Sequence, residues 1–321
     1  MASELKQIIG NMTSLERLVV SSEPSHTPAY FSFVQIQPRF LELGWSAFGP
    51  SLKALSLNIP LESLSSSFPP PDLELPKLEE LSITLDRAYA STEPEFGYRT
   101  FIPQFISRYS ATLQSLAIIS ASPGNASIIL EELPHLPVCT QLAYKCGWQG
   151  RQQNNLRGLH EFLRIHQRQL RSLTLKVWPS YGSLTVPPPA EEWYLQPCLQ
   201  LSMPNLRNLD LHLGYFPASY RGGAMVFIHK FRSSLVSLKI QKIRLSYSLL
   251  VDLITGFERD SKLQRLDLVI ESLSPELLEL LAMHLPRLQH LVLDQQDLRG
   301  HSAVPYQPGE VGVILSSIQS Y

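Results

Sequence analysis

The amino-acid sequence predicts an α/β fold, a leucine-rich-repeat solenoid shaped as an arc or horseshoe. A parallel sheet is expected on the concave side and irregular helices on the convex side. Three observations predict it: a short leucine motif recurs along the chain, each copy alternates as a β-strand does, and helical patterns lie between the copies. Because stacked repeats share one core, we expect a single domain over residues 1–321, with about ten repeats.

The recurring motif is Leu-x-x-Leu-x-aliphatic, and we call its three apolar positions the first, second and third anchor. The copies are Leu15/Leu18/Val20, Leu52/Leu55/Leu57, Leu78/Leu81/Ile83, Leu113/Leu116/Ile118, Cys139/Leu142/Tyr144 (degenerate), Leu170/Leu173/Leu175, Leu206/Leu209/Leu211, Leu235/Leu238/Ile240, Leu263/Leu266/Leu268 and Leu288/Leu291/Leu293. Successive first anchors lie 25 to 37 residues apart. The second and third anchors share one strand face because side chains alternate along a strand. That face is predicted to form the core.

Two kinds of sequence lie directly before the motif. Some carry helical apolar spacing, as in Phe101, Phe105, Ile106 and Tyr109 before Leu113, and in Leu159, Phe162, Leu163 and His166 before Leu170. Others place proline close before the motif, in Leu75-Pro76, Leu136-Pro137, Met203-Pro204 and Leu285-Pro286. We expect these prolines to stop the helix and extend the chain.

Charge and cysteine content exclude several classes of partner and compartment. The chain has 27 basic and 28 acidic residues, so it has no overall field to attract nucleic acid or an anionic membrane, and neither is expected as a partner. Its three cysteines are too few for a disulfide framework, which favours the cytoplasm or nucleus. No apolar run approaches the roughly 18 residues that a membrane span requires.

Residues between the anchors are expected to face away from the core, onto the concave surface. The earlier copies carry small or neutral residues there: Ala54, Ser56, Asn58, Ser82, Thr84, Ser115, Ala117 and Ile119. The later copies carry Asp210, His212, Lys239, Gln241, Arg265, Asp267, His290 and Asp294. One hypothesis is a mixed-charge docking face for a protein partner. The alternative is that these are ordinary solvated strand residues.

The longest insertion after a strand is rich in proline and aromatic residues and is the preferred contact loop. It carries Trp178, Tyr181, Trp193 and Tyr194, residue types that often supply binding hot spots. The alternative interpretation is that the aromatic side chains fold back and cover the edge of the sheet.

No catalytic motif is found, so the chain is not expected to be an enzyme or to hold a cofactor or metal. Gly-x-Ser-x-Gly, His-Glu-x-x-His and Walker-type sequences are absent. Cys139, Cys146 and Cys198 lack the ligand spacing of a zinc site and are interpreted as structural. Asp210 and His212 could share a metal ion or a proton beside Lys239, but a solvated pair is favoured.

Several stretches are similar to the irregular repeats of fungal F-box-type leucine-rich-repeat proteins. They are LPKLEELSI, MPNLRNLDLHL, LPRLQHLVL, FISRYSATLQSLAI and FLRIHQRQLRSLTL, and the resemblance covers nearly the whole chain. It implies a ribonuclease-inhibitor-like solenoid that recognises the substrate of a ubiquitin ligase, next to an F-box that binds the ligase adaptor. Only 14 residues precede Leu15, too few for an F-box. An adaptor is therefore expected as a partner only if an F-box lies upstream.

The predicted function is that of a protein–protein interaction scaffold whose partner the sequence does not identify. The alternative is a structural or vestigial repeat fragment with no ligand of its own, because the ends look unprotected and terminal repeats normally need polar caps. The last segment, Glu310–Ile318, is expected to be helical with no strand after it.

Overall fold

The structure is a computed structural model that describes residues 9–21, 41–60, 67–86, 96–120, 123–148, 156–179, 196–212, 221–258, 260–295 and 313–316. The chain divides into two compact units. The first comprises Met1–Trp148 and Gln152–Gln169, and the second Gln149–Arg151 and Leu170–Tyr321. Each unit is described by itself below, and the expectation of a single domain stays a prediction.

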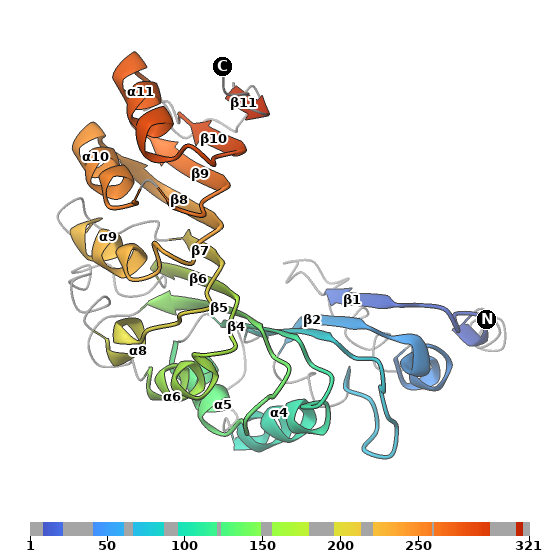
Figure 1. Ribbon diagram of the computed structural model, residues 1–321. Coiled ribbons are helices and arrows are strands. Elements are labelled where there is room, and N and C mark those ends of the chain that lie inside the picture. The colour runs from blue at the N-terminus through green and yellow to red at the C-terminus, as the bar shows by residue number, and fades with distance from the viewer. Residues whose placement is uncertain are drawn as a thin grey trace, which may run out of the picture. The chain divides into compact units, whose positions relative to one another are not determined.

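The described part of the first unit contains five parallel strands, each paired with the next along the chain (Figure 1). They are β1 (Arg17–Ser21), β2 (Ala54–Pro60), β3 (Glu80–Asp86), β4 (Ser115–Ser120) and β5 (Gln141–Trp148). The helices are one over residues 41–48, η1 (Gly49–Ser51), α4 (Phe96–Arg108), α5 (Pro123–Glu131) and α6 (Arg157–His166). The two helices expected before Leu113 and Leu170 are confirmed as α4 and α6.

The described part of the second unit continues the same alternation of strand and helix. Its strands are β6 (Ser172–Pro179), β7 (Asn208–His212), β8 (Ser237–Leu245), β9 (Arg265–Ile270), β10 (His290–Asp294) and β11 (Val313–Ser316). Its helices are α8 (Pro197–Gln200), α9 (Arg221–His229), α10 (Tyr247–Thr255) and α11 (Pro275–His284). Strands β6 to β10 pair in parallel, and β11 is antiparallel to β10.

The prediction of a helix over Glu310–Ile318 is wrong for the described residues Val313–Ser316, which form β11. The run Val313-Ile314-Leu315 contains two β-branched residues, which favour strands over helices. It also lies beside the edge of β10, whose backbone groups would otherwise lack strand partners. This edge is therefore paired, which weakens the argument that the last repeat is unprotected.

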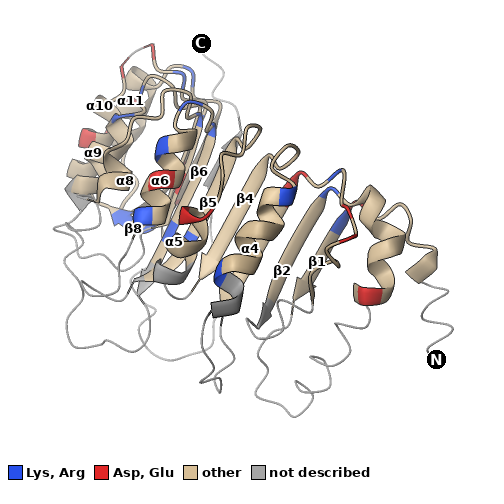
Figure 2. Ribbon diagram, turned by 90° about the horizontal axis from the view of Figure 1, so that it is seen from below, with Lys and Arg blue, Asp and Glu red and all other residues tan. Residues whose placement is uncertain are grey.

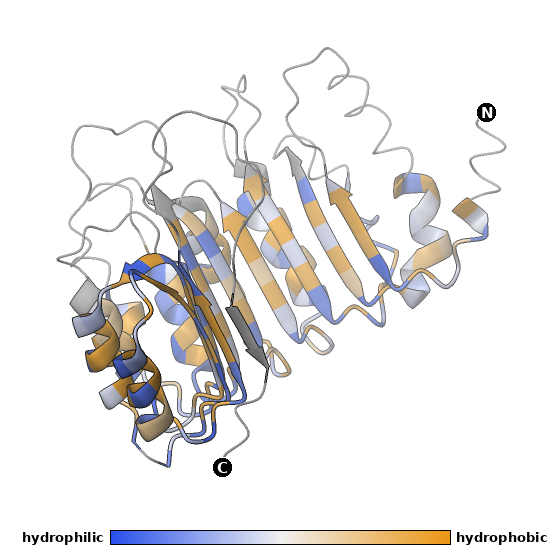
Figure 3. Cartoon of the chain, turned by 90° about the horizontal axis from the view of Figure 1, so that it is seen from above, coloured by the Kyte–Doolittle hydropathy of each residue, from blue (hydrophilic) through white to orange (hydrophobic). Residues whose placement is uncertain are grey.

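The anchors occupy equivalent positions in the strands from β1 to β10, so the predicted strand repeat is confirmed. The second anchors are register partners in each unit: Leu18, Leu55, Leu81, Leu116 and Leu142 in the first, and Leu173, Leu209, Leu238, Leu266 and Leu291 in the second. All second and third anchors are buried. Figure 3 shows apolar and polar residues alternating along the strands. Each unit is thus an α/β repeat with its anchors in the core.

A repeated backbone contact sets the register where each strand begins. The residue after the first anchor offers its carbonyl to two successive N–H groups of the next repeat. In the first unit, Lys53 and Ala54 both donate to Glu16 O, at 2.8 and 3.0 Å. In the second, Arg207 and Asn208 both donate to Arg171 O, at 2.8 and 2.9 Å. This repeated pair of hydrogen bonds aligns each anchor with its counterpart in the neighbouring repeat.

The prolines before the motif open tight turns, so the expected extension of the chain is wrong. The first anchor donates its N–H to the carbonyl three residues earlier, in the pairs Leu78–Leu75, Cys139–Leu136, Leu206–Met203 and Leu288–Leu285, at 3.0 to 3.1 Å. Proline takes the second position of each turn, where its fixed φ is favoured. The expected stop is observed in α11, which ends at His284, directly before Leu285-Pro286.

His166, at the end of α6, forms a hydrogen bond to the turn that leads into β5. Its Nδ1 lies 2.7 Å from Phe162 O, and its Nε2 accepts the N–H of Leu136 at 3.0 Å. Both contacts are satisfied together by the neutral ring protonated at Nδ1. Burial lowers the pKa of His166 below its ordinary value of 6.5, although the Phe162 contact acts in the opposite sense. The fold therefore favours the neutral ring.

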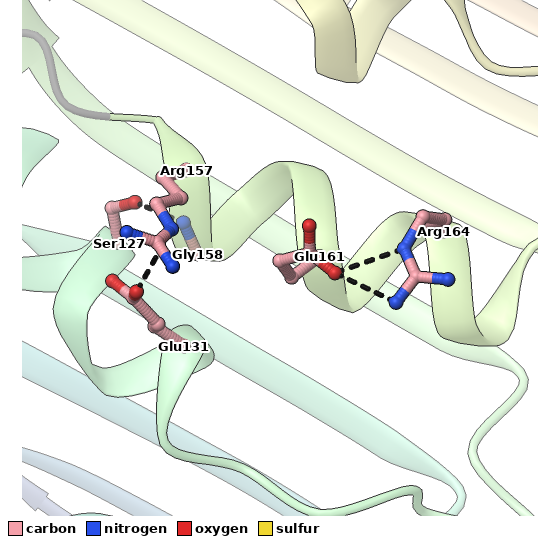
Figure 4. Close-up of polar contacts among 6 residues, drawn as sticks. All are labelled: Ser127, Glu131, Arg157, Gly158, Glu161 and Arg164. Carbon is pink, nitrogen blue, oxygen red and sulfur yellow. Dashed lines mark hydrogen bonds and ion pairs between the residues drawn. The ribbon is translucent and has the colours of Figure 1, made fainter.

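Helices α5 and α6 approach each other at a glycine (Figure 4). A Cβ on Gly158 would lie 1.7 Å from Ser127 O and 2.7 Å from Glu131 N, both backbone atoms. The N–H of Gly158 donates to Ser127 Oγ at 2.9 Å, and Arg157 Nε lies 3.1 Å from Glu131 Oε1. Only a residue without a side chain fits at position 158 without moving a helix.

Replacing Gly158 tests this helix contact. G158A is expected to lower the free energy of unfolding by about 3 kcal/mol, because the added methyl group forces α5 and α6 apart. G10A is the matched control, since a Cβ at Gly10 meets nothing within 4 Å. Urea unfolding of both variants measures the difference, and equal stabilities would contradict the close approach.

The neutral state of His166 predicts a pH dependence of stability. Because the folded pKa is lowered, His166 stabilises the fold fully above pH 6.5, and this contribution is lost as the pH falls from 6.5 towards the folded pKa. The slope is at most about 1.4 kcal/mol per pH unit. H166Q keeps an acceptor for the Leu136 N–H and should lose this slope in urea unfolding measured across the range, whereas H284Q should keep it.

Candidate functional site

The outward face of β7 to β10 is the strand face opposite the buried anchors of the second unit. It carries all eight charged and polar positions that the sequence selected. The register makes Asp210, Lys239 and Asp267 direct neighbours on β7, β8 and β9. His212 lies beside Gln241, and Arg265 beside His290. Asp294 has Val269 as its register partner on β9, so it is not next to another member of the set on that strand.

Two ion pairs connect charges on adjacent strands of this face. Lys176 Nζ lies 3.3 Å from Asp210 Oδ2, and Lys239 Nζ lies 3.3 Å from Asp267 Oδ2. The side chain of Asp267 is 14% exposed and that of Lys239 34%. We call Lys176, Asp210, Lys239 and Asp267 the charge ladder, because their signs alternate from β6 to β9. Opposite charges on neighbouring strands stabilise the sheet by about 0.2–1 kcal/mol per pair.

Lys176 is a member of the ladder that sequence reasoning missed. It occupies the outward position directly after the third anchor Leu175, the position equivalent to His212 on β7. That position is readable from the motif, so a search of every outward position in β6 would have found it. Its register partner on β7 is His212, so its ion pair with Asp210 runs diagonally between β6 and β7.

One acceptor in the ladder has no partner. Asp210 Oδ1 is shielded from solvent and makes no hydrogen bond, although Oδ2 of the same carboxylate faces Lys176. A shielded carboxylate oxygen without a donor is unfavourable, because the group has lost water without gaining a hydrogen bond.

A bulge interrupts β8 just past the ladder. The register passes from Ile240–Leu268 directly to Arg244–Val269, so Gln241, Lys242 and Ile243 have no counterpart on β9. Lys242 has a φ of 63°, in the left-handed region that favours glycine. Lys242 is exposed, so the bulge presents a further cation to solvent.

The outward face of the first unit differs in chemistry, as the sequence predicted. Its central register row consists of Val19, Ser56, Ser82, Ala117 and Ala143, none of which is charged. The row from Val19 to Ala117 borders a hollow of about 200 Å³. Arg17 Nη2 and Glu80 Oε2 lie 2.8 Å apart across this hollow, a pair that the sequence analysis did not identify.

The cysteines have the environment of structural residues. All three are buried. Burial raises the pKa of the Cys139 thiol to about 11 and that of Cys198 to about 12, so neither thiol is ionised near neutral pH. Among the residues that the structure describes, no three His, Cys, Asp or Glu side chains gather where they could hold a metal ion. The absence of catalysis stays a prediction.

The predicted aromatic contact loop falls outside the described residues. Tyr181, Trp193 and Tyr194 are not among them, and of Trp178 only the backbone in β6 is described. The hypothesis of a contact loop and its alternative, a loop folded over the sheet edge, both stay open.

The chain matches no protein-family model and no curated protein. The similarity to F-box-type repeat proteins therefore stays a prediction. In the described ranges, no helix is long and apolar enough to cross a membrane.

A double-mutant cycle on Lys239 and Asp267 tests the charge ladder. K239M is expected to lower the free energy of unfolding by about 1 kcal/mol, because it leaves a mostly buried carboxylate without its cation. The coupling between K239M and D267N should be about 0.5–1 kcal/mol. The matched pair in the first unit, Lys53 and Glu16, is 45% and 62% exposed and should show no measurable coupling. Equal coupling in both cycles would contradict the role of partial burial.

Proposed function

We propose that the chain is a protein–protein interaction scaffold, a leucine-rich-repeat solenoid whose outward strand face in the second unit receives a protein partner. The observation that carries this proposal is the charge ladder on the face opposite the anchors. The described helices α9, α10 and α11 lie on the other face of the strands (Figure 1). The ladder is thus available for a partner with a complementary charge pattern.

The alternating signs favour a protein over a uniformly charged polymer. Because Lys176 and Lys239 are balanced by Asp210 and Asp267, the ladder has no net charge to attract a polyanion. A partner gains instead by matching the order of the charges, which gives specificity more than raw affinity. The unsatisfied Asp210 Oδ1 supports the same proposal, because a donor from the partner would pair with it.

The resemblance to F-box-type proteins supports a more specific role within this proposal. The scaffold would recognise a substrate of a ubiquitin ligase in the cytoplasm or nucleus. A ligase adaptor would be a second partner only if an F-box lies upstream of these repeats.

Site-specific photo-crosslinking in cell extract tests the proposal. A benzoylphenylalanine at Thr174, in the register row of Asp210, is expected to form an adduct with a specific protein. The same residue at Glu279, exposed on α11, is the matched control and should not form that adduct.

Charge reversal decides whether the ladder itself is responsible. The combined variant D210K, K239E, R265E and D267K should abolish the Thr174 adduct while its circular dichroism spectrum stays unchanged. An undiminished adduct in this variant, or the same adduct from Glu279, would show that the outward face is not the binding surface.

A further inference from the structure

The amino ends of strands β6 to β10, with the turns that lead into them, form a second charged surface, which we call the amino rim. Its described residues are 170–172, 203–208, 232–237, 258, 260–265 and 285–290. Six exposed cations lie on it. One, Arg232, is paired with Glu258, and the other five are Arg171, Arg207, Lys262, Arg265 and Arg287. Figure 2 shows blue Lys and Arg segments on turns at this end of the second unit.

These five side chains have no hydrogen-bond or ion-pair partner in the described structure. The described rim holds two acidic residues, and one of them, Glu258, is already paired with Arg232 at 2.9 Å. The other is Asp260, which is exposed. The amino rim therefore has a marked excess of unpaired positive charge.

The repeat brings these cations together in neighbouring pairs. Arg207 N–H donates to Arg171 O at 2.8 Å, so the two arginines begin adjacent strands. Lys262 and Arg287 each directly precede the first anchor of adjacent repeats, and Arg265 lies beside His290. Adjacent strands lie about 4.8 Å apart. The cations form a band along the rim, within reach of one extended ligand.

The architecture alone does not account for the excess, because the equivalent rim of the first unit is balanced. There Lys53 pairs with Glu16 at 2.8 Å, and Arg17 with Glu80 at 2.8 Å. Cations also stabilise helix C-termini, but that effect is confined to the last helical turn. Arg287 lies three residues beyond α11, inside the proline turn.

We propose that the amino rim binds an acidic, extended segment of a protein, rich in aspartate or glutamate. Guanidinium groups bind carboxylates through two parallel hydrogen bonds. The exposed amides of Asn208, Gln264 and Gln289 lie along the same rim and can bond to the peptide groups of such a segment. The surface extends the proposed scaffold function, and Arg265 and His290 belong to both surfaces.

A protein segment fits the amino rim better than single-stranded nucleic acid. Proteins that bind single strands combine basic grooves with aromatic side chains on which the bases stack. The described exposed residues of the rim include no phenylalanine, tyrosine or tryptophan.

Fluorescence anisotropy with the purified full chain tests this inference. The probe is a labelled glutamate-rich peptide, compared with its glutamine counterpart and with single-stranded oligothymidine. The glutamate peptide should bind most tightly, and added salt should weaken it. R171Q/R207Q and K262Q/R287Q should each weaken it about tenfold or more. K77Q is the matched control, because Lys77 holds the same proline-turn position in the first unit as Arg287 does in the second. This variant should bind the glutamate peptide as tightly as the unchanged chain does.

Three results would overturn the inference: equal binding of the glutamate and glutamine peptides, a loss in K77Q equal to that in the rim variants, or tighter binding of the oligonucleotide. The rim variants change no residue of the charge ladder, and they leave Arg265 in place. Failure of peptide binding with an intact Thr174 adduct would therefore reject the amino rim alone, and the reverse outcome would reject the outward face alone.

Discussion

The alignment of the anchors between neighbouring repeats is the constraint on which the rest of each unit depends. A single strand and helix cannot bury their apolar sides alone, so each repeat relies on the next. The carbonyl after each first anchor accepts two N–H groups from the following repeat and so fixes the register. A slip of one residue would turn Leu209 or Leu238 outward and Asp210 or Lys239 into the core. The register that buries the anchors therefore also places the residues of the charge ladder on the outward face.

The strands were predictable from sequence because their determinants are local. Two anchors at a spacing of two residues define a strand face, and that pattern located the strands from β1 to β10. The proline turns were misjudged because proline both stops a helix and favours the second position of a turn. The choice between these depends on a hydrogen bond such as Leu78 N–H to Leu75 O. β11 was missed because its short segment gains its structure from the edge of β10.

The candidate site was predicted only in part, for a related reason. Sequence alternation identified Asp210, Lys239 and Asp267 as outward-facing, but not which charges pair across strands. Lys176 and Asp210 are 34 residues apart, and Arg17 and Glu80 are 63 apart. The intervening insertions vary in length, so the pairing could not be counted along the chain. Gly158 shows the same limit, since its closeness to Ser127 depends on how α5 and α6 pack.

The contrast between the two rims separates what the fold requires from what it leaves free. In both units the carbonyl after the first anchor accepts two N–H groups of the next repeat, and the turns before Leu78 and Leu288 contain the same hydrogen bond. Yet the first unit's rim pairs Arg17 and Lys53 with glutamates, whereas the amino rim leaves five cations unpaired in the described structure. Neighbouring unpaired cations repel each other and contribute no stability. Because repeat stability comes from the anchors and from contacts between neighbours, the fold tolerates this cost without needing the charge. A surface that costs some stability and is not imposed by the architecture is where binding is expected.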